Sequence, residues 1–168
     1  MFTQRPAEMV ASIALGDEVE ERVRGRIIIS TTTNGTRALR ACATAPTVAI
    51  AGFLNLGATA KWLTHLSPNR VVLVCAGTAE FAALEDVLAA GALCACLPGM
   101  EMDDSAAVVQ RAYHDARKDL REAVATSRNG SRLLGHSELR DDVELCLRRD
   151  VYDFAAVLDS AGIVRRVE

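Results

Sequence analysis

The hydroxyl-rich sequence TTTNGT, at residues 31–36, follows the apolar run IIIS and precedes RALRACATA. Hydroxyl groups and glycine next to a helix start are groups that can bind an anion such as phosphate. A β-hairpin turning at Asn34 and Gly35 would need a second strand, but RALRACATA has the composition of a helix. An Asn-x-Thr glycosylation site at Asn34 would need secretion, and MFTQRPAEMV is not organised as a signal peptide.

The interpretation that remains is a buried strand, a loop and the start of a helix. We expect Gly35 to adopt a positive φ and Thr36 to lie near the helix cap. Such a junction exposes backbone N–H groups and the positive end of a helix dipole, where the threonines could add hydroxyl donors and Arg37 a positive charge. A capped junction that binds no ligand is the alternative.

Two further junctions of this kind follow along the chain. AGFLN ends one apolar run and places Asn55 at a helix start, and CAGT ends another and places Thr78 at a helix start. If the strands are parallel, all three junctions face one crevice at the carboxyl ends of the strands. Together they predict a ligand-binding rim.

Two adjacent carboxylates, Glu85 and Asp86, interrupt the apolar sequence FAALEDVLAAGALCACL. A helix of this composition is expected to be largely buried, and a buried carboxylate needs a cation, a metal ion or several hydrogen-bond donors. Magnesium binds carboxylate oxygens together with water and phosphate oxygens. The alternative is a structural ion pair with an arginine such as Arg37 or Arg70.

The elements that would position these residues alternate along the chain. Strands are predicted at 27–30, 47–52 and 70–77, and helices at 37–45, 55–66 and 81–97. Short and nearly continuous apolar strands between helices are typical of a parallel sheet that is covered on both faces. We therefore predict an α/β fold: a mostly parallel sheet with helices on both faces, built from strand-loop-helix units.

One α/β domain is expected over residues 27–168, after a polar N-terminal segment at 1–26. Residues 27–98 would form its core, because they contain few charged side chains. Residues 99–168 would form a helical tail with closing strands.

Within the tail, residues 103–124 predict an amphipathic helix that begins near Asp103. Gly130 is expected to break the helical pattern, and residues 137–150 predict another helix with a Ser137 cap. The final sequences VYDFAAVL and GIVRRVE predict two short strands, either as an edge hairpin or as the end of the sheet.

Composition limits the possible partners. The net charge is −3 with acidic and basic residues intermixed, so neither nucleic-acid binding nor a basic membrane-binding face is expected. The longest apolar runs are shorter than a membrane-spanning helix, and the five cysteines lack zinc-binding spacing. The remaining candidate partners are a small polar ligand or another protein. We expect the protein to be cytoplasmic.

Four motifs, ISTTTNGTRAL, AGFLN, VVLVCAGT and LEDVLAAGAL, resemble in order and spacing the 2-phosphosulfolactate phosphatase family, named for a step in coenzyme M biosynthesis. The resemblance is dense over residues 27–97 and weaker over the tail. It implies an α/β hydrolase that depends on Mg²⁺ and converts 2-phosphosulfolactate, a small phosphorylated and sulfonated acid, to sulfolactate and phosphate.

The resemblance also implies roles for individual residues. The substrate-binding positions would be Thr32, Thr33, Asn34, Gly35, Thr36, Asn55, Gly77 and Thr78. The first loop would receive the phosphate or sulfonate, and Glu85 and Asp86 would be the catalytic and metal-binding residues that hold Mg²⁺ or position water.

The sequence also departs from the family pattern. The resemblance covers the C-terminal two-thirds of the family, and the preceding half, with its Asp-Leu-Arg-Ala-Thr and Gly-Glu-Arg type segments, is not found. Glu80 and Ala83 stand where the family usually has Gly and Ser, and a glutamate repels phosphate unless a metal ion intervenes. A catalytically inactive truncated homologue, acting as a binding or oligomerisation module, is therefore the alternative. An exposed sheet edge would favour a homo-oligomer.

Overall fold

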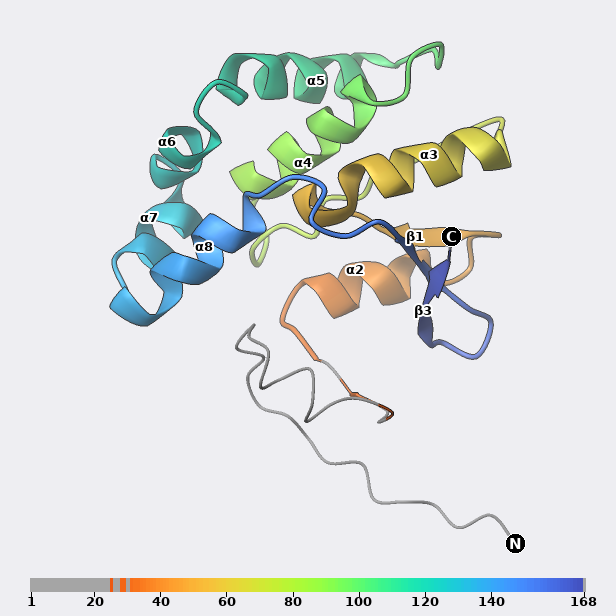
Figure 1. Ribbon diagram of the computed structural model, residues 1–168, viewed down its shortest axis with the longest axis horizontal. Coiled ribbons are helices and arrows are strands. Elements are labelled where there is room, and N and C mark those ends of the chain that lie inside the picture. Colours follow the sequence, from red (N-terminus) through yellow and green to blue (C-terminus); the bar gives the residue numbers. More distant parts are fainter. Residues whose placement is uncertain (1–24, 26–27, 30, 168) are drawn as a thin grey trace, which may run out of the picture.

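A computed structural model of the chain describes residue 25, residues 28–29 and residues 31–167 (Figure 1). Apart from Gly25, the predicted polar segment at 1–26 lies outside the described residues. The first elements in chain order are α2 (Gly35–Cys42), β1 (Val48–Ile50), η1 (Phe53–Asn55), α3 (Leu56–Leu66) and α4 (Leu84–Ala95). The tail contributes α5 (Asp104–Ala116), α6 (Leu120–Ala125), α7 (Arg128–Leu134), η2 (Ser137–Leu139), α8 (Arg140–Cys146), β2 (Ala155–Leu158) and β3 (Val164–Val167).

The three helices predicted before the tail are confirmed as α2, α3 and α4. The last of them begins later than predicted, because residues 78–81 form a tight turn. The backbone N–H of Thr78 donates to the carbonyl of Phe81, and the N–H of Phe81 donates back to the carbonyl of Thr78, at 2.9 and 3.1 Å. In Figure 1, α3 and α2 lie on opposite sides of β1.

The sheet contains three strands in the order β1-β2-β3, and both strand pairs are antiparallel. Val48 lies opposite Leu158, and Ala155 lies opposite Val167. The two short C-terminal strands are therefore confirmed, as a hairpin that pairs with β1. The described residues form a mixed α/β structure, but the mostly parallel sheet predicted from the apolar runs is not found among them.

The difference arises from the other two predicted strands. Residues 70–77 form no strand, and Val72 and Val74 in this segment are 64% and 55% exposed. Of the strand predicted at 27–30, only Ile28 and Ile29 are described, and they are not in a strand. An apolar run reports a tendency to be buried, whereas a strand also needs a neighbour for its backbone hydrogen bonds. Within the described residues, β1 pairs on one side only.

The hydrophobic core lies between the helices, and α4 is at its centre. Leu88, Ala92 and Leu93 of α4 are buried, together with Leu56 of α3 and Tyr113 of α5. Helix α4 packs along α5, and Gly91 allows this close approach, because a Cβ atom there would lie 2.0 Å from the carbonyl oxygen of Val109. The position of α4 is therefore determined on two sides by packing.

Asp150 connects the tail to the start of α3. Its carboxylate accepts a hydrogen bond from the backbone N–H of Gly57 at 2.6 Å, across 93 positions in the sequence. Its own N–H donates to the carbonyl of Phe53, and Tyr152 donates to the carbonyl of Leu54. The N-terminus of α3 is thus capped from the tail by a carboxylate, which its dipole favours.

The tail differs from the prediction in three places. The predicted cap at Ser137 is wrong, because Ser137 lies inside the short helix η2 and α8 begins only at Arg140. The helix expected at 103–124 is divided into α5 and α6, because Asp119 caps a new helix by accepting from the N–H of Glu122 at 2.8 Å. The break expected at Gly130 is wrong, since Gly130 lies inside α7. A Cβ atom at Gly130 would lie 2.1 Å from the carbonyl oxygen of Val124, so this glycine permits close packing of α6 and α7. The cap at Asp103 is confirmed.

None of the helices in the part of the chain that the structure describes is both long and apolar enough to span a membrane.

We expect Gly91→Ala to lower the free energy of unfolding by about 1–3 kcal/mol, because the new methyl group would force α4 and α5 apart. Urea denaturation followed by circular dichroism measures this change. Gly52→Ala is the matched control, because Gly52 has an extended backbone (φ −158°) and open space around its Cβ position. Equal stability of the two variants would contradict the packing described for Gly91.

Candidate active site

Two hydrogen bonds connect the first predicted junction, the third predicted junction and the start of α4. Oδ1 of Asn34, in the first loop, accepts from the backbone N–H of Ala79 at 3.2 Å. The backbone N–H of Gly77, in the third loop, donates to Oδ2 of Asp86 at 2.7 Å. The first loop, the third loop and the start of α4 therefore form one region, which we call the candidate active site.

The first loop is held mainly by bonds between its own threonines. The backbone N–H of Thr36 donates to the hydroxyl of Thr32 at 3.0 Å, and the hydroxyl of Thr36 donates to the carbonyl of Thr32 at 2.7 Å. Gly35 does not have a positive φ, and this expectation is wrong because α2 begins directly after Asn34. Thr33 and Gly35 remain exposed, so the loop still presents a hydroxyl and backbone groups to a ligand.

The third loop depends on glycine. Gly77 has a φ of 70°, and a Cβ atom there would lie 2.7 Å from the carbonyl oxygen of Phe81. Only glycine fits this combination of left-handed backbone and close contact. The resulting turn directs the N–H of Gly77 at Asp86 and places Thr78 beside α7.

Asn55 lies at the N-cap position of α3, as predicted, but its side chain does not face the other two junctions. Its side chain is buried, with Oδ1 accepting from the N–H of Gly52 at 3.0 Å and Nδ2 donating to the carbonyl of Ile50 at 3.1 Å. Both ends of the amide are therefore used to hold the chain after β1. Among the described residues, no hydrogen bond links Asn55 to the first or third loop, and the start of α3 is already capped by Asp150.

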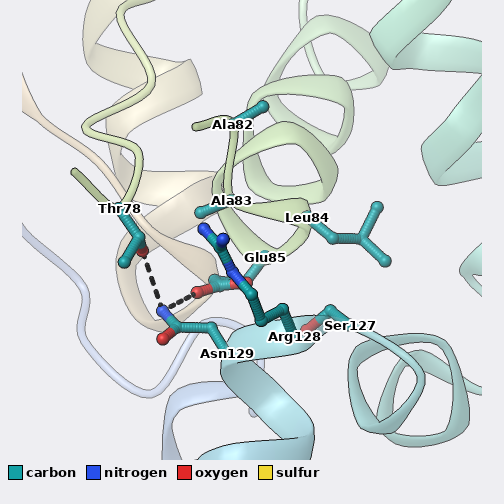
Figure 2. Close-up of a pocket in the computed structure, with 8 residues that line it drawn as sticks. All are labelled: Thr78, Ala82, Ala83, Leu84, Glu85, Ser127, Arg128 and Asn129. Atoms are coloured by element: carbon teal, nitrogen blue, oxygen red, sulfur yellow. Dashed lines mark hydrogen bonds between the residues drawn. The ribbon is translucent and has the colours of Figure 1, made fainter. Parts of the chain in front are cut away.

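Glu85 lies at a cavity of about 200 Å³ between α4 and α7 (Figure 2). Its Oε1 atom accepts from Nδ2 of Asn129 at 2.7 Å, and the same nitrogen lies 3.1 Å from the hydroxyl oxygen of Thr78. The Oε2 atom is buried and has no hydrogen-bond partner among the described residues. A buried carboxylate oxygen without a partner is costly, and it indicates a position where a ligand or cation would be favourable.

Asp86 has a pKa above the ordinary range of an aspartate. Burial is the main cause, and the negative charge of Glu85 adds to it. Hydrogen bonds from the backbone of Gly77 and Ala76 oppose the increase. A carboxyl group with this pKa can exchange a proton closer to neutral pH than a solvated aspartate can.

The two carboxylates are not neutralised by the arginines considered from the sequence. In the described part of the chain, neither Glu85 nor Asp86 forms a salt bridge with Arg37 or Arg70. No cluster of three or more His, Cys, Asp or Glu side chains suitable for a metal ion occurs there either. Magnesium usually needs only one or two carboxylates, with water and phosphate oxygens completing its ligands. The Oε2 atom of Glu85 fits that requirement.

The contribution of α7 to the candidate active site was not predicted from the sequence. Asn129 was part of a predicted helix break, yet it bonds to both Glu85 and Thr78 and is itself held by Arg132, whose guanidinium donates to Oδ1 of Asn129 at 3.1 Å. Arg128 lines the same cavity. The one signal available in the sequence was the concentration of polar side chains in SRNGSR.

Comparison with known proteins agrees with the resemblance of the motifs. A family model described as 2-phosphosulpholactate phosphatase matches residues 15–161. A probable 2-phosphosulfolactate phosphatase from Caldanaerobacter subterraneus subsp. tengcongensis is 36% identical over 152 residues, which are 88% of this chain and 61% of the relative.

Proteins of the same name from Symbiobacterium thermophilum and Synechocystis sp. are 33% and 30% identical to this chain. The matches cover 86% and 96% of this chain, and 63% and 70% of the relatives. The chain therefore spans about three fifths to two thirds of the length of these relatives, and the resemblance is confirmed.

We expect Asp86→Asn to raise the melting temperature at neutral pH. The raised pKa means that the folded state favours the protonated carboxyl of Asp86. The protonated carboxyl therefore stabilises the fold below the pKa of an unfolded aspartate, about 3.9. This stabilisation is lost as pH rises through the folded-state pKa. Asparagine stays neutral and can still accept the Gly77 hydrogen bond. Thermal unfolding from pH 3 to pH 8 should show a stabilisation that disappears at the acidic end, and a variant less stable than wild type at pH 7 would contradict it.

Proposed function

Because the chain belongs to the 2-phosphosulfolactate phosphatase family, we propose that it hydrolyses a phosphate ester of a small acidic molecule in a magnesium-dependent reaction. The substrate by analogy with the relatives' name is 2-phosphosulfolactate, which gives sulfolactate and phosphate. The chain spans 61% of the length of one such relative, so the activity of the whole relative comes to this chain only as a proposal. We further propose a cytoplasmic location.

The unpartnered Oε2 atom of Glu85 is the observation that carries this proposal. Oε1 of the same carboxylate is oriented by Asn129, so the orientation of Oε2 is fixed as well, and Glu85 lines the cavity. The cavity borders Thr78, whose loop is bonded to the first loop through Ala79. A cation-binding oxygen therefore lies close to a loop suited to phosphate.

The residues of the site have distinct proposed roles. When bound, Mg²⁺ neutralises charge on the phosphate oxygens, and Glu85 would hold it. The first loop would bind the phosphate through exposed backbone groups and Thr33. Asp86, with its raised pKa, would orient the attacking water and accept its proton, while Gly77 holds the carboxylate in place. Asn55 would contribute only by holding the backbone after β1.

We expect Glu85→Gln to reduce magnesium-dependent phosphate release from 2-phosphosulfolactate by about 10²-fold or more, because the substitution removes the charge that binds the cation. Phosphate release is measured across a magnesium titration with wild type and variant. Glu101→Gln is the matched control, because Glu101 is an exposed carboxylate outside the candidate active site. Wild-type release that is independent of magnesium, or a folded wild type without release, would overturn the proposal for this chain.

The second candidate function is an oligomerisation module, and the surface near β1 favours it. This strand is paired on one side only among the described residues, and Val72 and Val74 are exposed. An unpaired strand edge and exposed apolar side chains are both surfaces that a second chain can cover. We propose that a second copy of the chain covers it and forms a homo-oligomer.

Light scattering on the purified chain at micromolar concentration tests this second proposal. We expect a mass of at least twice 18.0 kDa, and we expect Val72→Lys to shift it toward the single chain, because a charged side chain on an exposed apolar surface opposes its burial between chains. The control is Val108→Lys on α5, where the replaced valine is similarly exposed. A mass of one chain for the wild type would exclude the oligomer.

A further inference from the structure

Arg128 lines the same cavity as Glu85, and its positive charge has no role in the reaction proposed above. We propose that Arg128 binds the second acidic group of the substrate, a carboxylate or sulfonate, and so selects phosphate esters that carry such a group. This inference rests on the proposed phosphatase function and assigns a specificity-determining residue to the same site.

The guanidinium of Arg128 stacks on the ring of Phe81. Its central carbon lies 4.4 Å from the centroid of the Phe81 ring. Within the described residues it forms no salt bridge with any carboxylate. Stacking on an aromatic face orients the planar group while its N–H edges stay available, and two of those N–H groups match the two oxygens of a carboxylate or sulfonate.

The side chain of Arg128 is directed toward the cavity. Figure 2 shows it extending from α7 toward Ala83 at the start of α4. Ala82 and Ala83 line this part of the cavity, and their small side chains leave room in front of the guanidinium. The cavity of about 200 Å³ is several times the liquid volume of one water molecule, about 30 Å³, so it suits a small acid.

The neighbouring Arg132 is already engaged. Its guanidinium donates to Oδ1 of Asn129, and Nδ2 of Asn129 donates to Glu85. Arg132 therefore orients the carboxylate of Glu85 through Asn129 rather than binding a ligand. Arg128 thus differs from Arg132 in having no polar partner among the described residues. The two arginines, one turn apart on α7, have separate roles.

Charge explains why a second acidic group would bind on this side. The phosphate would lie toward the first loop, which contacts the third loop through Asn34 and Ala79. Another anion placed near Glu85 would be repelled by it unless a cation stood beside that anion. Arg128 is that cation, and it lines the same cavity as Thr78 of the third loop. A substrate with two anionic ends would therefore span the site from the loop to α7.

The test compares two esters of the same length with wild type and Arg128→Gln. Phosphoglycolate carries a carboxylate, and ethyl phosphate has none. We expect the variant to lower kcat/KM for phosphoglycolate by about tenfold or more and to leave that for ethyl phosphate within about twofold, since only the first substrate has a group for Arg128. Arg128→Lys should give an intermediate loss, because lysine keeps the charge without the planar fork. Arg111→Gln, at an exposed position on α5, is the matched control.

A binding measurement separates failure of this inference from failure of the phosphatase proposal. Calorimetric titration with sulfolactate needs no turnover, and we expect Arg128→Gln to weaken its binding about tenfold while Arg111→Gln leaves it unchanged. Equal losses for both esters, equal sulfolactate affinity in wild type and Arg128→Gln, or no sulfolactate binding by wild type would each overturn the role of Arg128. Sulfolactate binding that depends on Arg128 in a chain that releases no phosphate from 2-phosphosulfolactate or from either ester would overturn the phosphatase function and leave the anion site standing. Circular dichroism verifies that the variants are folded, as expected for an exposed side chain.

Discussion

The first turn of α4 carries two adjacent carboxylates at the head of an apolar helix, and the candidate active site depends on how they are compensated. One face of α4 is buried against its neighbours, so the helix cannot rotate to carry Glu85 and Asp86 into solvent without exposing that face. The positive end of the helix dipole favours both charges, but partial burial opposes them. The backbone of Gly77 stabilises one carboxylate and Asn129 stabilises one oxygen of the other. The remaining oxygen of Glu85 has no hydrogen-bond partner among the described residues.

The position of α7 follows from packing rather than from the chemistry of the site. Gly130 lets α7 approach the carbonyl of Val124 in α6 more closely than any other residue would permit. The preceding residue is Asn129, so this close packing also places the amide against Glu85. Because Gly130 at the packing contact and Asn129 at the site are adjacent in sequence, the packing of α6 against α7 is coupled to the geometry of the Glu85 carboxylate. Arg128 reaches the cavity by the same arrangement.

The local elements could be predicted well, because helices depend on contacts between residues three and four positions apart. Helices α2, α3 and α4 were predicted from such patterns to within a few residues. The two C-terminal strands were also predicted, although their arrangement as a hairpin was one of two alternatives. Strand pairing could not be predicted in the same way. The run at 70–77 has the composition of a buried strand, but its neighbours are determined by distant parts of the chain, and no strand forms there among the described residues. The break predicted at Gly130 failed for a related reason: a glycine that makes room for another helix has the same appearance in sequence as one that ends a helix.

The sequence by itself determined the chemical groups of the site: the hydroxyl-rich loop, the glycine at position 77 and the pair of carboxylates on an apolar helix. It also determined the family, through motifs that lie close together along the chain. Only the tertiary structure decided which groups meet. The hydrogen-bond partners of Glu85 and Asn34 lie 44 and 45 positions away in the sequence. The motifs predicted Asn55 in the same site, but its amide bonds to the neighbouring backbone instead. The physical reason is that hydrogen bonds of buried polar groups are completed wherever packing brings a partner within about 3 Å, and that geometry is a property of the whole fold.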